Sequence, residues 1–187
     1  MSYYTIIIPI FNEQSKLPTL LKHIKYYSEL GHEILIIDDG SNDGSKSILY
    51  KCDYINLITL SKNRGKGVAL IYGLKKALNN KIVIFDGDLE LDPFDIKKLM
   101  VLNRSNKIDS VFGNRYTKVE IKTFWDFGNN LITSYFNFMY NSNIKDALCC
   151  AKSFFKSDIR IETLKAKKFD IDVEITSKLI NRKIYYK

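Results

Sequence analysis

Carboxylate side chains follow three of the short apolar runs in this 187-residue sequence. They are Glu13, Asp38, Asp39, Asp86 and Asp88. Carboxylates brought close together repel one another unless a cation lies between them, and Mg²⁺ and Mn²⁺ prefer hard oxygen ligands. Because Asp86 and Asp88 are separated only by Gly87, both can approach one ion, and Glu90 continues the alternate spacing as a third candidate ligand. The pattern predicts a Mg²⁺ or Mn²⁺ site, with a simple strand-ending turn as the alternative.

A second candidate site is the polar, glycine-bearing loop 61–67. Arg64 and Lys66 lie beside Gly65 and Gly67 where a helix is predicted to begin. The backbone N–H groups of such a loop, together with the two cations, would hold a phosphate or a nucleobase carbonyl. The loop is neither a P-loop nor a dinucleotide fingerprint, since GxxxxGK[ST] is absent and no GxGxxG follows the first apolar run.

These residues must be positioned by the elements that surround them. Strands are predicted over 5–10, 33–37, 55–60 and 81–85, with helical patterns between them. Regular alternation of strands and helices is typical of an α/β fold with a mostly parallel central sheet and helices on both faces. The carboxyl ends of parallel strands share one edge, so the acidic residues are expected to converge there.

The second half of the chain has a less regular pattern. Beyond 110–112 it contains an aromatic helix over 124–140 and an amphipathic stretch over 173–180. We expect the aromatic helix to be partly buried rather than to lie at a membrane interface. Its side chains expected in the core are Trp125, Phe127, Phe136 and Phe138. With no repeat or linker, residues 1–187 are interpreted as one domain.

Charge and cysteine content narrow the possible partners and compartment. The 29 Lys and Arg outnumber the 21 Asp and Glu, and the net charge of +8 favours nucleic acid, a phosphorylated substrate or a membrane surface. Three cysteines without CxxC spacing indicate reduced thiols. Neither a signal segment nor a spanning run of about 20 apolar residues is present. We expect a cytoplasmic protein, with peripheral contact at the cytoplasmic membrane face left open.

Five short motifs resemble family 2 glycosyltransferases with the GT-A fold. They are IPIFNE (8–13), DDGSNDG (38–44), NRGKG (63–67), DGDLE (86–90) and GNRY (113–116). Each motif alone is common, but their order and spacing over residues 4–116 are specific, and they are most similar to the dolichyl- or polyprenyl-phosphate sugar transferase branch. The resemblance implies a nucleotide-sugar-binding part, 1–116, and an acceptor part, 117–187. Relatives usually continue further, so the resemblance implies either a minimal or a truncated acceptor part.

The resemblance also assigns the donor site. Glu13 would hydrogen-bond the ribose or base, Asp39 would contact the base, and Asp86 and Asp88 would be the DXD pair on the metal. Further donor-binding positions are Pro9, Phe11, Asp38, Ser41, Arg64 and Lys66. Glu90 stands where the branch usually has Gln, which keeps an oxygen ligand but adds a charge.

The acceptor side is less completely matched. Arg115 would bind the acceptor phosphate or the donor diphosphate, and Asp146 and Glu174 are the candidate catalytic carboxylates. The usual Gly near Asp146 is replaced by Cys150, which alters the expected loop. For the acidic segment 169–174, capping of a helix by Asp170 or Asp172 is the alternative to catalysis.

The implied activity is metal-assisted, inverting transfer of a sugar from a nucleotide-sugar donor, of the hexosyltransferase type. The acceptor would be a polyprenyl phosphate or a cell-surface glycan precursor. A hydroxyl acceptor needs a base, whereas a phosphate is already ionised and needs only positioning. A noncatalytic module that binds a sugar nucleotide or glycan is the alternative function. No recognised nucleic-acid-binding module occurs in the sequence, so we expect no nucleic acid partner.

Overall fold

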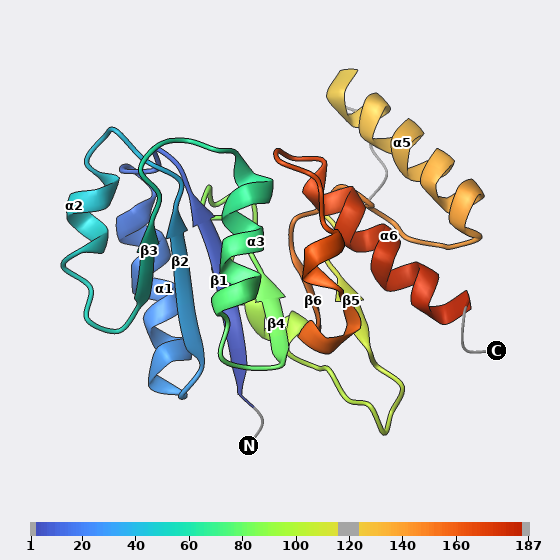
Figure 1. Ribbon diagram of the computed structural model, residues 1–187, viewed down its shortest axis with the longest axis horizontal. Helices are drawn as coiled ribbons and strands as arrows, with labels where there is room; N and C mark the ends of the chain where they lie inside the picture. The colour runs from blue at the N-terminus through green and yellow to red at the C-terminus, as the bar shows by residue number, and fades with distance from the viewer. Residues whose placement is uncertain (1–2, 116–123, 185–187) are drawn as a thin grey trace.

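The computed structural model describes residues 3–115 and 124–184. Its centre is a six-stranded sheet with the order β3-β2-β1-β4-β6-β5 (Figure 1). The strands are β1 (Tyr4–Ile10), β2 (Glu33–Asp38), β3 (Asn56–Thr59), β4 (Lys81–Ile84), β5 (Ser110–Phe112) and β6 (Lys152–Phe155). The α-helices are α1 (Leu17–Glu29), α2 (Ser45–Leu49), α3 (Lys66–Lys76), α4 (Ile96–Leu99), α5 (Phe124–Tyr140) and α6 (Ile171–Ile184). Short 3₁₀ helices are η1 (Pro93–Asp95), η2 (Lys156–Asp158) and η3 (Ile161–Thr163).

The alternation of strands and helices in the first half produces parallel pairing. β1 pairs in parallel with β2 and β4, and β2 with β3. β6 is antiparallel to both β4 and β5, so the sheet is mixed but mostly parallel. The predicted α/β architecture is therefore confirmed, and the carboxyl ends of β1, β2 and β4 form one edge.

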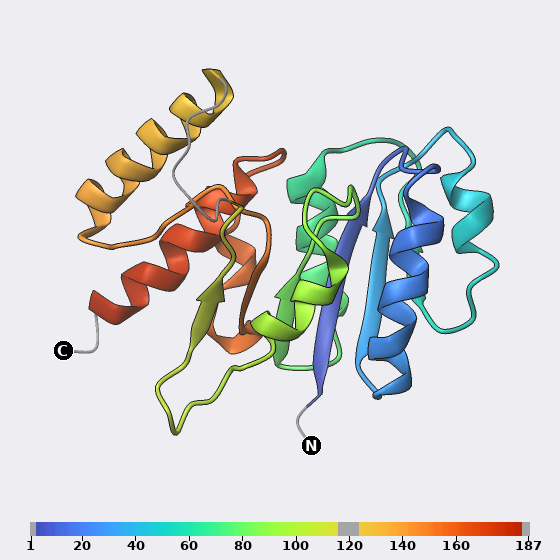
Figure 2. The ribbon, with the colours of Figure 1, turned by 180° about the vertical axis from the view of Figure 1, so that it is seen from behind.

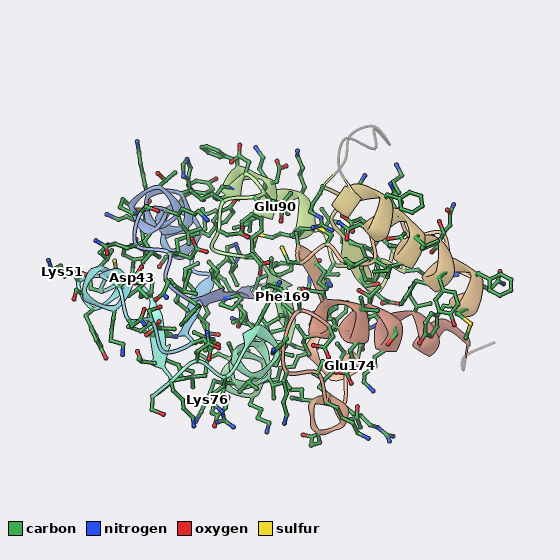
Figure 3. The ribbon with its side chains drawn as sticks, turned by 90° about the horizontal axis from the view of Figure 1, so that it is seen from above. Asp43, Lys51, Lys76, Glu90, Phe169 and Glu174 are labelled. Atoms are coloured by element: carbon green, nitrogen blue, oxygen red, sulfur yellow. The ribbon has the colours of Figure 1, made fainter. Side chains whose placement is uncertain are left out.

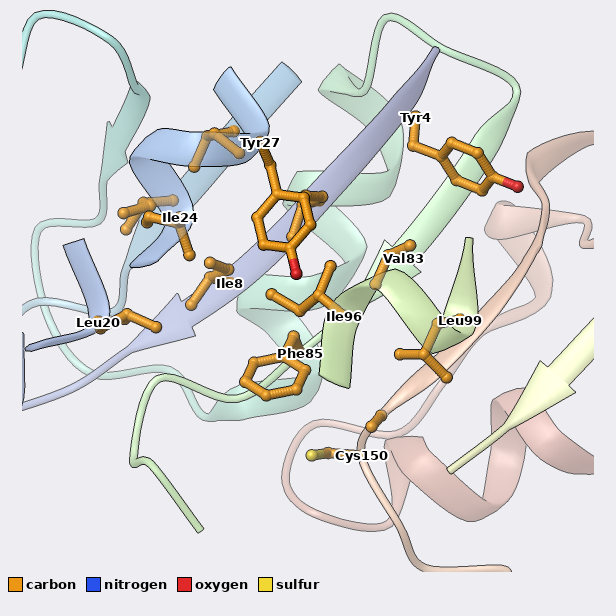
Figure 4. Close-up of a cluster of buried hydrophobic side chains, with 14 of the residues drawn as sticks. Tyr4, Ile8, Leu20, Ile24, Tyr27, Val83, Phe85, Ile96, Leu99 and Cys150 are labelled. Carbon is orange, nitrogen blue, oxygen red and sulfur yellow. The ribbon is translucent and has the colours of Figure 1, made fainter. Parts of the chain in front are cut away.

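Side chains of the central strands alternate between two hydrophobic layers. Along β1, Ile6 and Ile8 belong to the cluster that contains the stripe of α1, whereas Ile7 belongs to the cluster that contains α3 and α6. Figure 4 shows the first layer, in which Leu20 and Ile24 of α1 pack beside Ile8. The two clusters bury both faces of the sheet, which is why its strands are almost continuously apolar.

α5 lies at the periphery and packs against α6 (Figures 1 and 2). Phe136 is buried as predicted, but Phe127 is 52% exposed and Phe138 is 83% exposed. The prediction that these two side chains lie in the core is wrong, because only one face of this helix meets the rest of the chain; the Trp125 side chain lies outside the described residues. Among the described residues, no helix has the length and apolar character that a membrane crossing requires.

Candidate active site

A pocket of about 400 Å³ opens at the carboxyl ends of β1, β2 and β4. Its wall contains Pro9, Ile10, Phe11, Glu13, Asp39, Asn63, Gly65, Lys66, Asp86, Gly87, Asp88, Lys168 and Phe169. The predicted convergence of Glu13, Asp39, Asp86 and Asp88 on one edge of the sheet is confirmed. Lys168 and Phe169 come from the second half of the chain, so both halves build this pocket.

Asp39 organises the loop that leads into α3. Its carboxylate is buried and accepts hydrogen bonds from the backbone N–H groups of Arg64 at 2.9 Å and Gly65 at 2.7 Å. The N–H of Gly67 donates to the carbonyl of Lys167 at 3.0 Å. The N–H groups of Arg64, Gly65 and Gly67 therefore already donate to protein oxygens, and phosphate binding by the loop stays a prediction.

Asp38 and Ser41 support the pocket from outside its wall. Asp38 is fully buried and accepts a hydrogen bond from the Ser41 N–H at 3.0 Å. The Ser41 hydroxyl in turn accepts from the N–H of Asn12 at 2.9 Å. These bonds join the loops that follow β1 and β2, so both residues shape the pocket without facing it.

The Lys66 ammonium lies between two carboxylates at the floor of the pocket. It is 2.6 Å from Asp86 Oδ2 and 2.8 Å from Asp172 Oδ2, and its side chain is 9% exposed. Burial alone would lower the pKa of Lys66, but Asp86 and Asp172 outweigh it and hold that pKa above its ordinary value. The buried cation therefore stays charged. The sequence alone presents Asp172 as a helix-capping candidate within an acidic segment, since nothing local connects it to a lysine 106 residues away.

The Asp86-Gly87-Asp88 turn fits the predicted cation site. A Cβ atom on Gly87 would lie 2.1 Å from Ile10 Cδ1, so a larger residue between the two acids would have to displace the buried Ile10 side chain. Asp86 Oδ1 is buried and has no hydrogen-bond partner among the described residues. An unpartnered carboxylate oxygen beside a second carboxylate suits a hard divalent ion.

The ion would still need oxygens from elsewhere. Within the described part of the chain, no group of three or more acidic, cysteine or histidine side chains is arranged to hold a metal. Glu90, expected as a third ligand, is instead 3.5 Å from Arg115 Nη1 and lies outside the pocket wall. Water molecules and the oxygens of a bound ligand are further sources.

Arg115 forms a two-point contact with Asp146. Nε of Arg115 is 2.8 Å from Asp146 Oδ2, and Nη2 is 3.1 Å from Oδ1. Asp146 is buried, so the pair fixes the orientation of the guanidinium. Tyr116, the last residue of the GNRY motif, lies outside the described residues.

Two further expected site residues point elsewhere. Glu174 accepts hydrogen bonds from the backbone N–H groups of Lys165 and Ala166, at 3.0 and 2.9 Å, and lies outside the pocket wall. In Figure 3 it is on α6, on the other side of Phe169 from Glu90. The guanidinium of Arg64 is exposed beside Tyr72, with 3.4 Å between Nη1 and the hydroxyl. Arg64, expected at the donor site, and Glu174, expected as a catalytic carboxylate on the acceptor side, therefore both lie outside the wall of this pocket.

Residues 5–161 match the family model described as Glycosyl transferase family 2. The chain belongs to glycosyl transferase family 2. Among curated members, the undecaprenyl-phosphate 4-deoxy-4-formamido-L-arabinose transferase of Salmonella paratyphi B is 32% identical over 133 residues. That match covers 62% of this chain and 41% of the Salmonella protein, so the chain spans less than half the length of this relative.

Solved structures establish the fold of this family 2 member. Glucosyl-3-phosphoglycerate synthase from Mycobacterium tuberculosis, in complex with UDP, superposes with a TM-score of 0.74 at 15% identity, over 97% of this chain and 66% of that one. S. aureus TarS 1-349 superposes with a TM-score of 0.63 at 16% identity, over 96% of this chain and 55% of that one. The predicted GT-A fold is confirmed.

Proposed function

We propose that this chain is a glycosyltransferase that moves a sugar from a nucleotide-sugar donor to a polyprenyl phosphate, with inversion at the anomeric carbon. The observation that carries the proposal is the single pocket where Glu13, Asp39, Asp86 and Asp88 meet the buried ammonium of Lys66. An acidic wall with one fixed cation suits a diphosphate that arrives with a divalent ion. Family membership and the fold support the same reaction.

The donor would lie along the pocket wall. Phe11 is 40% exposed and offers an aromatic surface to the nucleoside, next to Pro9 and Glu13. Asp86 and Asp88 would hold Mg²⁺ or Mn²⁺, and when bound the ion supplies positive charge to the diphosphate as it leaves. The mycobacterial synthase has been solved with Mn²⁺ and UDP, which supports this assignment.

The arrangement on the acceptor side favours a phosphate over a hydroxyl. Asp146 holds Arg115 through both of its oxygens, and Glu174 holds a loop. Neither carboxylate is placed to remove a proton, and an ionised phosphate needs no base. We therefore infer that Asp146 positions Arg115 for the phosphate. The undecaprenyl phosphate in the name of the Salmonella relative supports this acceptor.

An exposed apolar face on α5 supports peripheral contact with the membrane that carries such an acceptor. Phe127, Leu131, Tyr135 and Phe138 recur at intervals of four, four and three residues, and each is more than half exposed. This spacing places them along one side of the helix. A helix that lies in the bilayer interface buries such a side among the lipids.

The experiment that tests the proposal measures binding and release separately. Thermal unfolding is recorded with UDP, GDP, CDP and dTDP, and with the nucleotide sugars in which each of them carries a hexose or arabinose. Each ligand is tested with and without Mn²⁺. A ligand that binds the native state raises the unfolding temperature. We expect the nucleotide and nucleotide sugars of one base, including a hexose donor, to stabilise the chain only when metal is present. Addition of a polyprenyl phosphate in detergent should then release the nucleoside diphosphate from the nucleotide sugar.

Asp88→Asn should abolish that release, whereas Asp95→Asn, a substitution of a half-exposed residue paired with Lys98, should leave it unchanged. Binding without release would identify a noncatalytic module instead. Absence of binding by every nucleotide would refute the proposal.

A further inference from the structure

The carboxylate of Asp172, in the first turn of α6, joins two lysines that come from different parts of the fold. Lys66 begins α3 and lies 2.8 Å from Asp172 Oδ2. Lys152 of β6 donates to the Asp172 carbonyl at 2.9 Å and lies 3.4 Å from Oδ1. Each carboxylate oxygen thus faces a different ammonium.

Lys152 holds Asp172 from the interior. Its side chain is 1% exposed, and its ammonium also lies 3.3 Å from the Thr176 hydroxyl, one turn further along α6. A buried ammonium needs both a counter-charge and hydrogen-bond acceptors, and these two residues of α6 supply them. The contact therefore fixes the register and rotation of α6 against the sheet.

The segment before α6 makes a second contact with the start of α3. The Lys167 carbonyl accepts from the Gly67 N–H at 3.0 Å, and the Phe169 ring lies 5.7 Å from the Lys66 ammonium. A Cβ atom on Gly67 would come within 2.4 Å of the Ala166 carbonyl oxygen, so the segment packs tightly there. Backbone and side-chain contacts together dock α6 onto the donor pocket.

We propose that Asp172 is a positioning residue that fixes the Lys66 ammonium beside Asp86, with Lys152 fixing Asp172 in turn. The inference rests on the proposed function, since Lys66 would face the donor diphosphate. Asp172 is 3% exposed and is occupied by two cations, so it does not act as a base. α6 thus contributes to the donor site through Lys66 alone.

This role predicts a larger effect on kcat than on KM. Removing the Asp172 charge takes away an anion that repels the diphosphate, which strengthens donor binding. It also releases the Lys66 ammonium from its position, which weakens donor binding. The two effects oppose each other in the ground state. Misplacement of a positioned group lowers turnover, and we expect a loss of about tenfold or more in kcat. KM should change much less.

The first measurement requires no ligand. Each lysine of the free protein is acetylated with acetic anhydride and quantified by mass spectrometry, in the wild type, Asp172→Asn and Asp170→Asn. Asp170 is the matched control, because it is exposed and its carboxylate accepts a hydrogen bond from the backbone N–H of Lys168, not from Lys66. We expect Lys66 to react several-fold faster in Asp172→Asn and at the wild-type rate in Asp170→Asn. Unchanged reactivity of Lys66 in Asp172→Asn overturns the inference. This outcome does not depend on whether the wild-type protein has glycosyltransferase activity.

The second measurement is a double-mutant cycle on release of nucleoside diphosphate from UDP-glucose or GDP-mannose. Asp172→Asn should lower kcat in the wild type and have no further effect in Lys66→Met, because the acid acts through that lysine. An equal loss in both backgrounds overturns the inference, since it would report a general distortion of α6. Asp172→Glu should restore part of the activity.

Asp172→Asn leaves the buried Lys152 without its charged partner and can therefore destabilise the fold. A second variant separates this effect from the loss of the contact with Lys66. Lys152→Met combined with Asp172→Asn removes both charges and should show the same acetylation and kcat changes. A folded double variant with wild-type values for both overturns the inference. Failure of the wild type to release any nucleoside diphosphate counts against the proposed function alone.

Discussion

Both carboxylate oxygens of Asp146 bond the guanidinium of Arg115, at 2.8 Å from Nε and 3.1 Å from Nη2. Asp146 is buried and Arg115 is mostly so, with 17% of its side chain exposed. A two-point contact between planar groups fixes the plane of the guanidinium as well as its position. Asp146, a candidate base by its sequence motif, is therefore better placed to orient an arginine.

This contact predicts different effects on acceptor and donor. Asp146→Asn and Arg115→Lys should each weaken binding of a short polyprenyl phosphate in detergent by about tenfold, because the fixed geometry is lost. Affinity for nucleoside diphosphate, measured by calorimetry, should change much less. A variant Asp146→Asn that binds the acceptor normally but transfers nothing would restore Asp146 as a base.

The glycine between the two acids allows a paired test of packing. Gly87→Ala should destabilise the chain by about 1–3 kcal/mol, because the new methyl group would overlap Ile10. It should also impair nucleotide binding by moving Asp86 and Asp88. Gly128→Ala is the control: nothing lies within 4 Å of its Cβ position in α5, and alanine is favoured over glycine in a helix by about 0.5–1 kcal/mol. Urea unfolding measures the change in the free energy of unfolding for both variants. Equal changes in Gly87→Ala and Gly128→Ala would contradict the packing argument.

The exposed face of α5 should govern membrane association. Leu131→Ser with Phe138→Ser should reduce sedimentation with phosphatidylcholine and phosphatidylglycerol vesicles several-fold, because both side chains would insert among lipids. Their exposure means that stability should change by less than about 1 kcal/mol. Leu78→Ser, at another residue that is 79% exposed, is the control and should sediment like the wild type. If sedimentation depended on net charge alone, the wild type, the double variant and Leu78→Ser would sediment equally. That result would contradict a role for the α5 face.

His32 predicts how stability depends on pH. Burial lowers the pKa of His32 below its ordinary value of 6.5, and its Nδ1 accepts from the Tyr4 N–H at 3.3 Å, so the folded state favours the neutral ring. The unfolded chain therefore binds a proton at higher pH than the folded chain does. The free energy of unfolding should fall as the pH drops below 6.5, and the decrease should end below the folded-state pKa. Urea titrations from pH 8 to 5 should show a shallower decrease in His32→Asn; an identical slope would refute the assignment.

Much of the donor site followed from local sequence. The runs that became β1, β2 and β4 are apolar and β-branched, and each is followed by acids and a turn. Because parallel strands end at one edge, Asp39 and Asp86 had to lie near one another once the alternation of strands and helices was recognised. Gly87 could be placed between two acids from sequence, although the Ile10 side chain that excludes a larger residue could not.

The side chains from α6 and α3 depended on tertiary structure. Asp172 and Glu174 are two residues apart on one helix, so their side chains point about 200° apart, and the docking of α6 decides which one meets Lys66. The pattern of the sequence determined that acids and glycines line one edge of a parallel sheet. Only the packing of α6 brought Asp172 to that edge, because a contact across 106 residues depends on the position and rotation of a whole helix.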